Sequence, residues 1–236
     1  MKKEDFHMKT LEILRKQDLE FPEEHFEELF KYMEMLIEWN ERINLTSITE
    51  PGEIIEKHFV DSLTILPYIE DNQNVIDIGT GAGFPGIPVS IANKKIKVTL
   101  LDSLNKRINF LNEVISCLKL INVETVHSRA EDYVKITRET YDIAVSRAVA
   151  NMSTLAEYLL PYVKVGGRAI FMKGPNVHDE IEKSKKAIRI LGGKIEKIDN
   201  FLLNDNERNL IIIKKIKNTP KQYPRKAGKP NKEPIC

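Results

Sequence analysis

Four glycines stand within eight residues of the run Asp-Ile-Gly-Thr-Gly-Ala-Gly-Phe-Pro-Gly, which begins at Asp77. The run overlaps the end of a short apolar segment, residues 74–78, whose pattern predicts a buried parallel strand. Glycine in a regular element loses much backbone entropy, so we do not expect these glycines to serve packing. Gly79, Gly81 and Gly83 instead suit a turn in which the backbone approaches a ligand and then enters a helix. The run therefore predicts a small-molecule cofactor site.

The residues around the glycines indicate the type of cofactor. Residues 81–86 match the dinucleotide fingerprint G-x-G-x-x-G, so an NAD-dependent oxidoreductase is one interpretation. Asp77 argues against it, because a carboxylate at the end of the strand repels a diphosphate and attracts an ammonium or sulfonium group. Pro85 and Pro88 also interrupt the amides that a dinucleotide-binding helix would present. S-adenosyl-L-methionine has a cationic amino acid end and no phosphate, so it is the cofactor that we expect.

Acidic residues also follow the next two predicted strands. Asp102 ends the second strand, where a carboxylate can accept both hydroxyls of a ribose, although it could equally cap the helix at 104–119. Ala130 and Glu131 follow the third strand, where a side chain or a backbone amide can contact the adenine edge. Glu131 could also be a first-turn acid favoured by the helix dipole. Both positions are consistent with an adenosine ligand, and neither distinguishes S-adenosylmethionine from NAD.

Strand and helix patterns alternate from residue 74 onward. The predicted strands are 74–78, 97–101, 122–127, 141–146, 167–173, 194–203 and 208–216. The predicted helices between them are 86–93, 104–119, 129–134, 154–161 and 177–191. Such alternation predicts a doubly wound α/β fold, and the short gap before the last strand predicts an antiparallel hairpin. A seven-stranded, mostly parallel sheet that ends in a hairpin is the Rossmann-like arrangement of class I methyltransferases.

Helical patterns precede the sheet, and we divide the chain into three parts. Residues 1–50 form an N-terminal helical extension that includes a helix from about Pro22 to Arg42, and residues 51–213 form the cofactor-binding domain. A further helix is expected over 54–66. Residues 214–236 carry eight Lys/Arg and one acid, although the whole chain has a net charge of only +1. We expect this segment to be a basic arm for an anionic partner, rather than a disordered solubilising tail.

Composition limits the cellular setting. The chain has no apolar stretch long enough to span a bilayer and no signal-peptide pattern, so we expect a cytoplasmic protein without membrane contact. Its two cysteines, Cys117 and Cys236, have no metal-ligand spacing, and we expect no metal. Cys117 is expected to be a core residue of its helix. Nothing in the sequence requires more than a monomer.

Several stretches together resemble one known family. They are Asn44-Leu45-Thr46, His58-Phe59-Val60-Asp61-Ser62, DIGTGAGFPGIP from residue 77, LLDSLNKRINFL from residue 100, SRAED from residue 128 and Ser146-Arg147-Ala148. They resemble the bacterial small-subunit rRNA guanine-N7 methyltransferase G family, also called glucose-inhibited division protein B. The resemblance extends into the tail sequence YPRKAGKPNKEP, and Ala82 stands where many members carry Pro.

The resemblance implies transfer of a methyl group from S-adenosylmethionine to N7 of a guanosine in 16S rRNA. It also implies that the cofactor is contacted by Gly79, Phe84, Ala130, Glu131 and Arg147. Guanine N7 carries a lone pair, so no general base is required, and catalysis would come from alignment in a desolvated pocket. The alternative is a methyltransferase that acts on another RNA or on a small molecule.

Other residues have two interpretations each. Arg147 could bind the cofactor or pair with Asp77 or Glu131 and hold the site together. His58 and Asp61 could face the target base, but a hydrogen-bonded brace between helix and sheet is favoured. These three residues, Arg147, His58 and Asp61, are the catalytic candidates.

Basic side chains provide the candidate contacts to 16S rRNA or the small ribosomal subunit. They are Lys106, Arg107, Lys173, Arg225 and Lys226. Each could instead only be solvated. Removal of the residues after Ile216 is expected to weaken RNA binding and to leave cofactor affinity intact.

Overall fold

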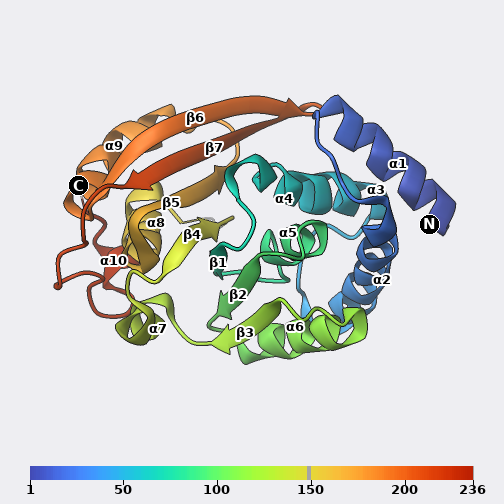
Figure 1. Cartoon of the computed structure of the whole chain (residues 1–236), viewed down its shortest axis with the longest axis horizontal. Helices are drawn as coiled ribbons and strands as arrows, with labels where there is room; N and C mark the ends of the chain where they lie inside the picture. The colour runs from blue at the N-terminus through green and yellow to red at the C-terminus, as the bar shows by residue number, and fades with distance from the viewer. Residues whose placement is uncertain (148–149, 236) are drawn as a thin grey trace.

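A computed structural model of the chain describes residues 1–147 and 150–235. Ala148 of the Ser-Arg-Ala motif and Cys236 therefore lie outside the described residues. Seven strands form one sheet in the order β3-β2-β1-β4-β5-β7-β6, with β7 antiparallel to both of its neighbours (Figure 1). The strands are β1 (Asn74–Ile78), β2 (Lys97–Asp102), β3 (Val123–His127), β4 (Tyr141–Ser146), β5 (Val163–Lys173), β6 (Gly193–Leu203) and β7 (Asn206–Lys215). The predicted fold class is confirmed.

Helices cover both faces of the sheet because successive residues of each strand point to opposite sides. Val75 of β1 packs in one core and Ile76, the next residue, packs in the other. One face is covered by α7 (Ala130–Thr137), α8 (Met152–Leu159) and α9 (His178–Ile190). The opposite face carries α5 (Gly86–Ala92), α6 (Asn105–Leu118), α1 (Lys3–Lys16) and α2 (Phe26–Ile43). The N-terminal helices thus share a core with the sheet.

A helical segment with an irregular centre connects α2 to the sheet. The helix expected over 54–66 begins earlier, with α3 (Pro51–Ile54), continues as the π-helix η2 (Ile55–Val60) and ends with α4 (Asp61–Leu63). Glu50 starts it by accepting a hydrogen bond from the Glu53 amide (2.8 Å). A π-helical turn is uncommon and is often found at functional sites. Here it carries His58 to the carboxyl edge of the sheet.

The C-terminal segment, residues 218–235, packs back on the body and includes the short helix α10 (Lys229–Lys232). The described part of the predicted basic arm is therefore folded onto the body. Lys215, just before the segment, is buried and pairs with Glu139 (2.9 Å), while Arg225 pairs with Glu157 (2.7 Å). Both carboxylates lie far away in the sequence, so the local excess of Lys and Arg does not reveal these pairs.

Two smaller findings concern the composition of the chain. Cys117 is exposed on α6, so the expectation that it belongs to the core is wrong. No helix in the described ranges is long and apolar enough to cross a membrane.

The glycines of the loop after β1 divide into two kinds. Gly79 and Gly81 have φ of +72° and +64°, and a Cβ built on either would meet no side chain within 4 Å. On Gly86, a Cβ would lie 2.3 Å from Leu100 Cδ2, and on Gly83 it would lie 2.7 Å from Tyr32 Oη. Packing thus requires two of the four glycines, contrary to the expectation that none serves it, while the other two leave open space for a ligand.

We predict that Gly83→Ala destabilises the fold more than Gly166→Ala does. Both positions have positive φ, which costs a non-glycine residue about 1–2 kcal/mol. Only at Gly83 would the new methyl group also meet Tyr32 and Ile87, which adds about 1–3 kcal/mol of overpacking. Urea denaturation measures both effects, and equal losses would argue against a packing role for Gly83.

Candidate active site

A buried carboxylate organises the loop at the carboxyl end of β1. Asp77 Oδ2 accepts hydrogen bonds from Thr80 Oγ1 (2.7 Å) and from the Gly86 amide (2.9 Å). Its other oxygen is buried without a partner among the described residues. Burial raises the pKa of Asp77 to about 6, although the two hydrogen bonds and Arg147 oppose the rise. Asp77 lies beneath the loop, at the switch point between β1 and β4 where ligands bind in open α/β sheets.

A cavity of about 360 Å³ opens beside this loop. The ends of β1 to β4, together with α8 and the C-terminal segment, supply its walls. Of the residues predicted to bind a cofactor, the described lining includes Gly79, Asp102, Ala130 and Glu131. The remaining ones, Asp77, Gly81, Gly83, Phe84 and Arg147, lie outside that lining. Four of the nine predicted cofactor-binding residues thus line this cavity.

Asp102, which lines the cavity, connects the glycine loop to the start of α6. Its Oδ2 accepts from the Gly81 amide (3.0 Å) and from Arg107 Nη1 (3.1 Å), and its Oδ1 accepts from the Leu104 amide (2.9 Å). The helix-cap interpretation is thus partly realised, because the Leu104 amide lies at the start of α6. The same carboxylate holds the glycine loop against β2 and still faces the cavity.

Glu131 forms the opposite wall with the C-terminal segment. This buried carboxylate accepts a hydrogen bond from the Gly228 amide (2.8 Å). Burial, together with the Glu131 and Glu157 carboxylates, raises the pKa of the neighbouring Tyr158 to about 12. Tyr158 and Gly228 both line the cavity. Glu131 is at the start of α7, so the first-turn interpretation agrees with its position, but its carboxylate also faces the cavity.

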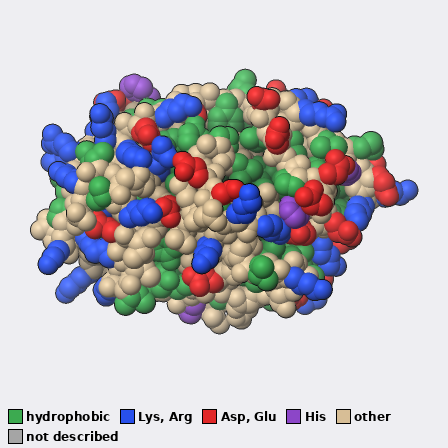
Figure 2. All heavy atoms as spheres, in the orientation of Figure 1, with side chains coloured by type: hydrophobic (Ala, Val, Ile, Leu, Met, Phe, Trp, Pro, Cys, Tyr) green, Lys and Arg blue, Asp and Glu red, His purple; other side chains and the backbone are tan. Residues whose placement is uncertain are grey.

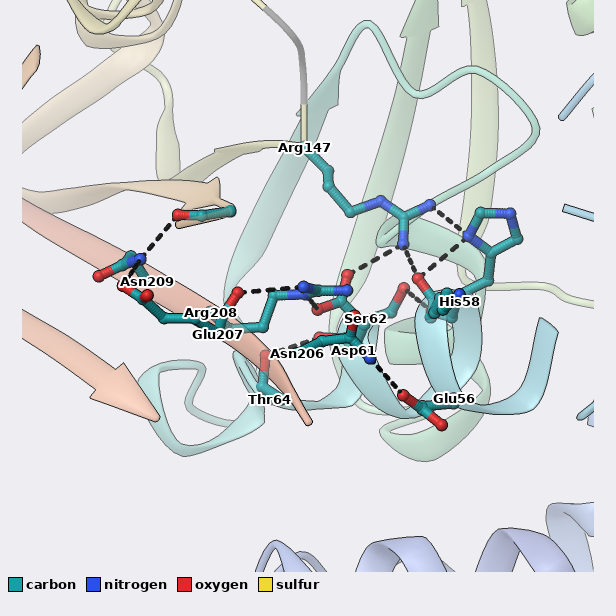
Figure 3. A network of polar contacts seen from close by, with 12 residues as sticks. Glu56, His58, Asp61, Ser62, Thr64, Arg147, Asn206, Glu207, Arg208 and Asn209 are labelled. Carbon is teal, nitrogen blue, oxygen red and sulfur yellow. Dashed lines mark hydrogen bonds and ion pairs between the residues drawn. The ribbon is translucent and has the colours of Figure 1, made fainter. Parts of the chain in front are cut away.

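A second cavity of about 500 Å³ lies at the ends of β4, β5 and β7. Asp61, one of its lining residues, joins Arg147, which follows β4, to Arg208 of β7 (Figure 3). Its Oδ2 accepts from Arg147 Nη1 (3.1 Å) and its Oδ1 accepts from Arg208 Nε (2.8 Å). Arg147 therefore pairs with neither Asp77 nor Glu131, the partners considered from the sequence. The two arginines and Asp61 together brace the π-helical segment against the sheet.

His58 fixes the other side of the Arg147 guanidinium. Burial and the Arg147 charge lower the pKa of His58 to about 3, so the imidazole is neutral at neutral pH. Arginine only donates, so His58 Nδ1 accepts from Arg147 Nη2 (3.0 Å) and His58 Nε2 donates to Thr46 Oγ1 (2.8 Å). Phe84 stacks on His58 at 4.5 Å between ring centroids, and the Arg147 guanidinium lies over its ring at 4.9 Å. The predicted brace is present, and it also lines the second cavity.

Comparison with known proteins assigns the family. A family model described as "rRNA small subunit methyltransferase G" matches residues 25–211. The chain belongs to this family. The ribosomal RNA small subunit methyltransferase G of Clostridium perfringens (strain SM101) is 53% identical over 92% of this chain and 93% of its own length. The protein of the same name from Clostridium botulinum (strain Eklund 17B) is 55% identical over the same shares of the two chains.

Solved structures agree on the fold. A structure of M. jannaschii TYW2 in complex with AdoMet superposes with a TM-score of 0.58 at 16% identity, over 72% of this chain and 80% of that one. A SAM-dependent methyltransferase from Aquifex aeolicus gives a TM-score of 0.54 at 17% identity, over 72% of this chain and 96% of that one. The sheet order and the antiparallel C-terminal hairpin are those of a class I methyltransferase.

The first cavity fits S-adenosyl-L-methionine, the methyl donor of this family. Its volume lies within the usual range for small-molecule sites. Gly79 and Gly81 leave open space at the loop, and the unpaired buried oxygen of Asp77 adds negative charge beneath it. A cationic ligand without phosphates matches this combination, whereas a diphosphate would meet the Asp77 charge.

The predicted RNA contacts of this methyltransferase lie in two kinds of environment. Three of the side chains are held by carboxylates: Arg107 by Asp102, Lys173 by Glu180 (2.9 Å) and Arg225 by Glu157. Lys106 and Lys226 are exposed. The structure thus leaves these two lysines available to a phosphate.

Several residues that complete the site are not among those predicted from the sequence. They include Thr46, Tyr158, Glu180, Arg208 and Gly228. A topological rule could have found Arg208, because a hairpin strand antiparallel to β5 must begin at the carboxyl edge of the sheet. For Gly228, no comparable local signal exists in the sequence.

We predict that His58 makes folding sensitive to acid. Its pKa is about 3 in the fold and about 6.5 in an unfolded chain, so the unfolded state binds an extra proton between these values. The free energy of unfolding should therefore fall as the pH drops below about 6.5, by up to about 1.4 kcal/mol per pH unit. Urea titrations at several pH values should show a shallower fall in His58→Gln. His178→Gln, which removes an exposed histidine, is the control, and a wild-type slope in His58→Gln would contradict the assignment.

Proposed function

We propose that the chain transfers a methyl group from S-adenosyl-L-methionine to N7 of a guanosine in 16S rRNA. The match to the family over residues 25–211 carries this proposal. The two cavities support it, because they flank the end of β4, with Ser146 lining the first and Arg147 the second. The first would hold the methyl donor and the second would receive the guanine.

The bound cofactor supplies an electrophilic methyl group whose bond to sulfur breaks as the bond to nitrogen forms. Guanine N7 attacks with its own lone pair, so the protein removes no proton before transfer. His58 is neutral and has hydrogen bonds on both ring nitrogens, which suits positioning better than acid–base catalysis. Arg147 is held by Asp61, His58 and the carbonyl of Lys57 (2.8 Å), so it forms a rigid wall for the base. Alignment is then the main contribution to the rate.

Basic groups around the second cavity favour RNA as the substrate. Four cations and two carboxylates are among its described lining: Lys57, Arg147, Lys173, Arg208, Asp61 and Glu180. In Figure 2, Lys and Arg side chains gather toward the end of the molecule where α9 and the C-terminal segment lie. Such a surface attracts phosphates without reading sequence. Lys106 and Lys226 would extend the contact along the carboxyl edge.

The proposed function is tested by methyl transfer from labelled cofactor. We expect incorporation into 16S rRNA, either naked or assembled in small subunits, with 23S rRNA as the negative control. Digestion to nucleosides should recover the label as 7-methylguanosine. Label in another nucleoside, or transfer to neither form of 16S rRNA, would contradict the proposal and favour a different substrate.

We predict that the Asp77 charge strengthens cofactor binding. In Asp77→Asn the amide oxygen can still accept from Thr80 and Gly86, so the loop keeps its shape. Calorimetry at neutral pH should show a loss of affinity on the order of tenfold. Wild-type affinity should also fall as the pH drops through about 6, where the carboxyl group gains a proton, and the variant should show no such fall. Identical pH profiles would refute the electrostatic role.

A further inference from the structure

The C-terminal segment reaches the cavity from outside the sheet. After β7 it passes beside α7 and α8, and Figure 1 shows α10 lying next to them. Gly228 and Asn231 of this segment line the cavity together with Ala130 and Glu131. Residues nearly one hundred positions apart in the chain thus form one wall. The family model ends at residue 211, so its match does not include this part of the cavity.

A buried charge pair anchors the segment. The Glu157 side chain is completely buried in α8 and accepts four hydrogen bonds from Arg225, one from the amide and three from the guanidinium at 2.7–3.1 Å. A carboxylate buried this deeply would be strongly destabilising without its partner. The body therefore contains a buried negative charge that the segment neutralises, which would not be expected of a tail that only solubilises the protein.

Further contacts hold the segment on both sides of Arg225. Arg138 donates to the carbonyl oxygens of Thr219 (2.8 Å) and Tyr223 (2.7 Å). Thr154 Oγ1 donates to the carbonyl oxygen of the buried Pro230 (3.0 Å). The backbone between these anchors has little freedom, so Gly228 is held at a defined place over the cavity.

Gly228 connects the anchored segment to the ligand side of the cavity. Its φ of +79° lies in the left-handed region, and this turn directs its amide to the Glu131 carboxylate. Glu131 is buried and faces the cavity, at the position for which the sequence predicts a contact to the adenosine part of the ligand. The hydrogen bond thus fixes the orientation of Glu131 before any ligand arrives.

We propose that residues 218–235 are a structural part of the cofactor site, in which the docked segment closes the nucleoside end of the cavity and Gly228 positions Glu131. This rests on the proposed function for the identity of the ligand. It opposes the expectation that residues after Ile216 can be removed without loss of cofactor affinity. Gly228 acts here as a positioning residue, since it reaches the ligand through Glu131.

Calorimetry with S-adenosylhomocysteine, the demethylated cofactor, tests the proposal. A chain that ends at Lys217 should bind it at least about tenfold more weakly than the wild type. Gly228→Pro, which removes the amide and cannot adopt a positive φ, should weaken binding similarly while the Arg225–Glu157 pair remains. Lys221→Gln removes an exposed charge from the same segment and should leave affinity within about twofold.

A shorter ligand separates a role at the nucleoside end of the cavity from a role at its amino acid end, and the melting midpoint reports general destabilisation. Methylthioadenosine lacks the amino acid part, so Gly228→Pro should weaken its binding by the same factor as that of S-adenosylhomocysteine. If Gly228→Pro, with a wild-type melting midpoint, binds both ligands like the wild type, the proposal is wrong. If the truncated chain folds, wild-type binding of both ligands by it would likewise contradict the proposal. If the truncated chain does not fold, the result for Gly228→Pro decides. Failure of the wild type to bind either ligand would instead count against the proposed function.

Discussion

The buried carboxylate of Asp77 is the constraint on which the cofactor site depends. An ionised group without water is strongly destabilising unless donors surround it, and the hydrogen-bond donors of Asp77 among the described residues come from the loop that follows β1. Thr80 and the Gly86 amide provide them, so the loop folds over the strand end and α5 begins directly after it. Asp102 on the adjacent strand then holds the Gly81 amide. Two carboxylates on neighbouring strands thus fix a backbone that has few side chains of its own.

A second carboxylate network links segments that the topology keeps apart. Asp61 lies after the π-helix, Arg147 follows β4 and Arg208 lies in β7. Removing Asp61 would leave two guanidinium groups without their shared counter-charge, so this carboxylate joins the terminal hairpin to the end of β4 at the second cavity. Thr46 extends the network by holding the far nitrogen of His58. The N-terminal extension therefore contributes to the orientation of Arg147 without touching it.

Short hydrophobic patterns in the sequence predicted the strands whose bounds depend on neighbouring residues alone. The bounds of β1 and β4 agree with the sequence analysis because each is a short apolar run between polar turns. β5 begins at Val163 rather than at residue 167, because Gly166 and Gly167 are accommodated where the pairing with β4 is irregular. The glycine loop and the expected topology predicted a site at the carboxyl edge of the sheet, and the two cavities lie there. Contacts across long separations, such as Arg208 with Asp61 or Arg225 with Glu157, leave no pattern in the sequence.

The distribution of cations shows what a count of charges leaves out in the C-terminal segment. A count of Lys and Arg treats each one as free to meet an anion, yet Lys215 and Arg225 already have carboxylate partners within the fold. Their role is to attach the segment, and two lysines that remain exposed on it, Lys229 and Lys232, directly follow the cavity residues Gly228 and Asn231. In the proposed reaction, positive charge moves from sulfur to the guanine ring and no proton has to leave. A site for that reaction depends on rigid walls and matched charges rather than on a titrating side chain, and the buried pairs of this chain provide that rigidity.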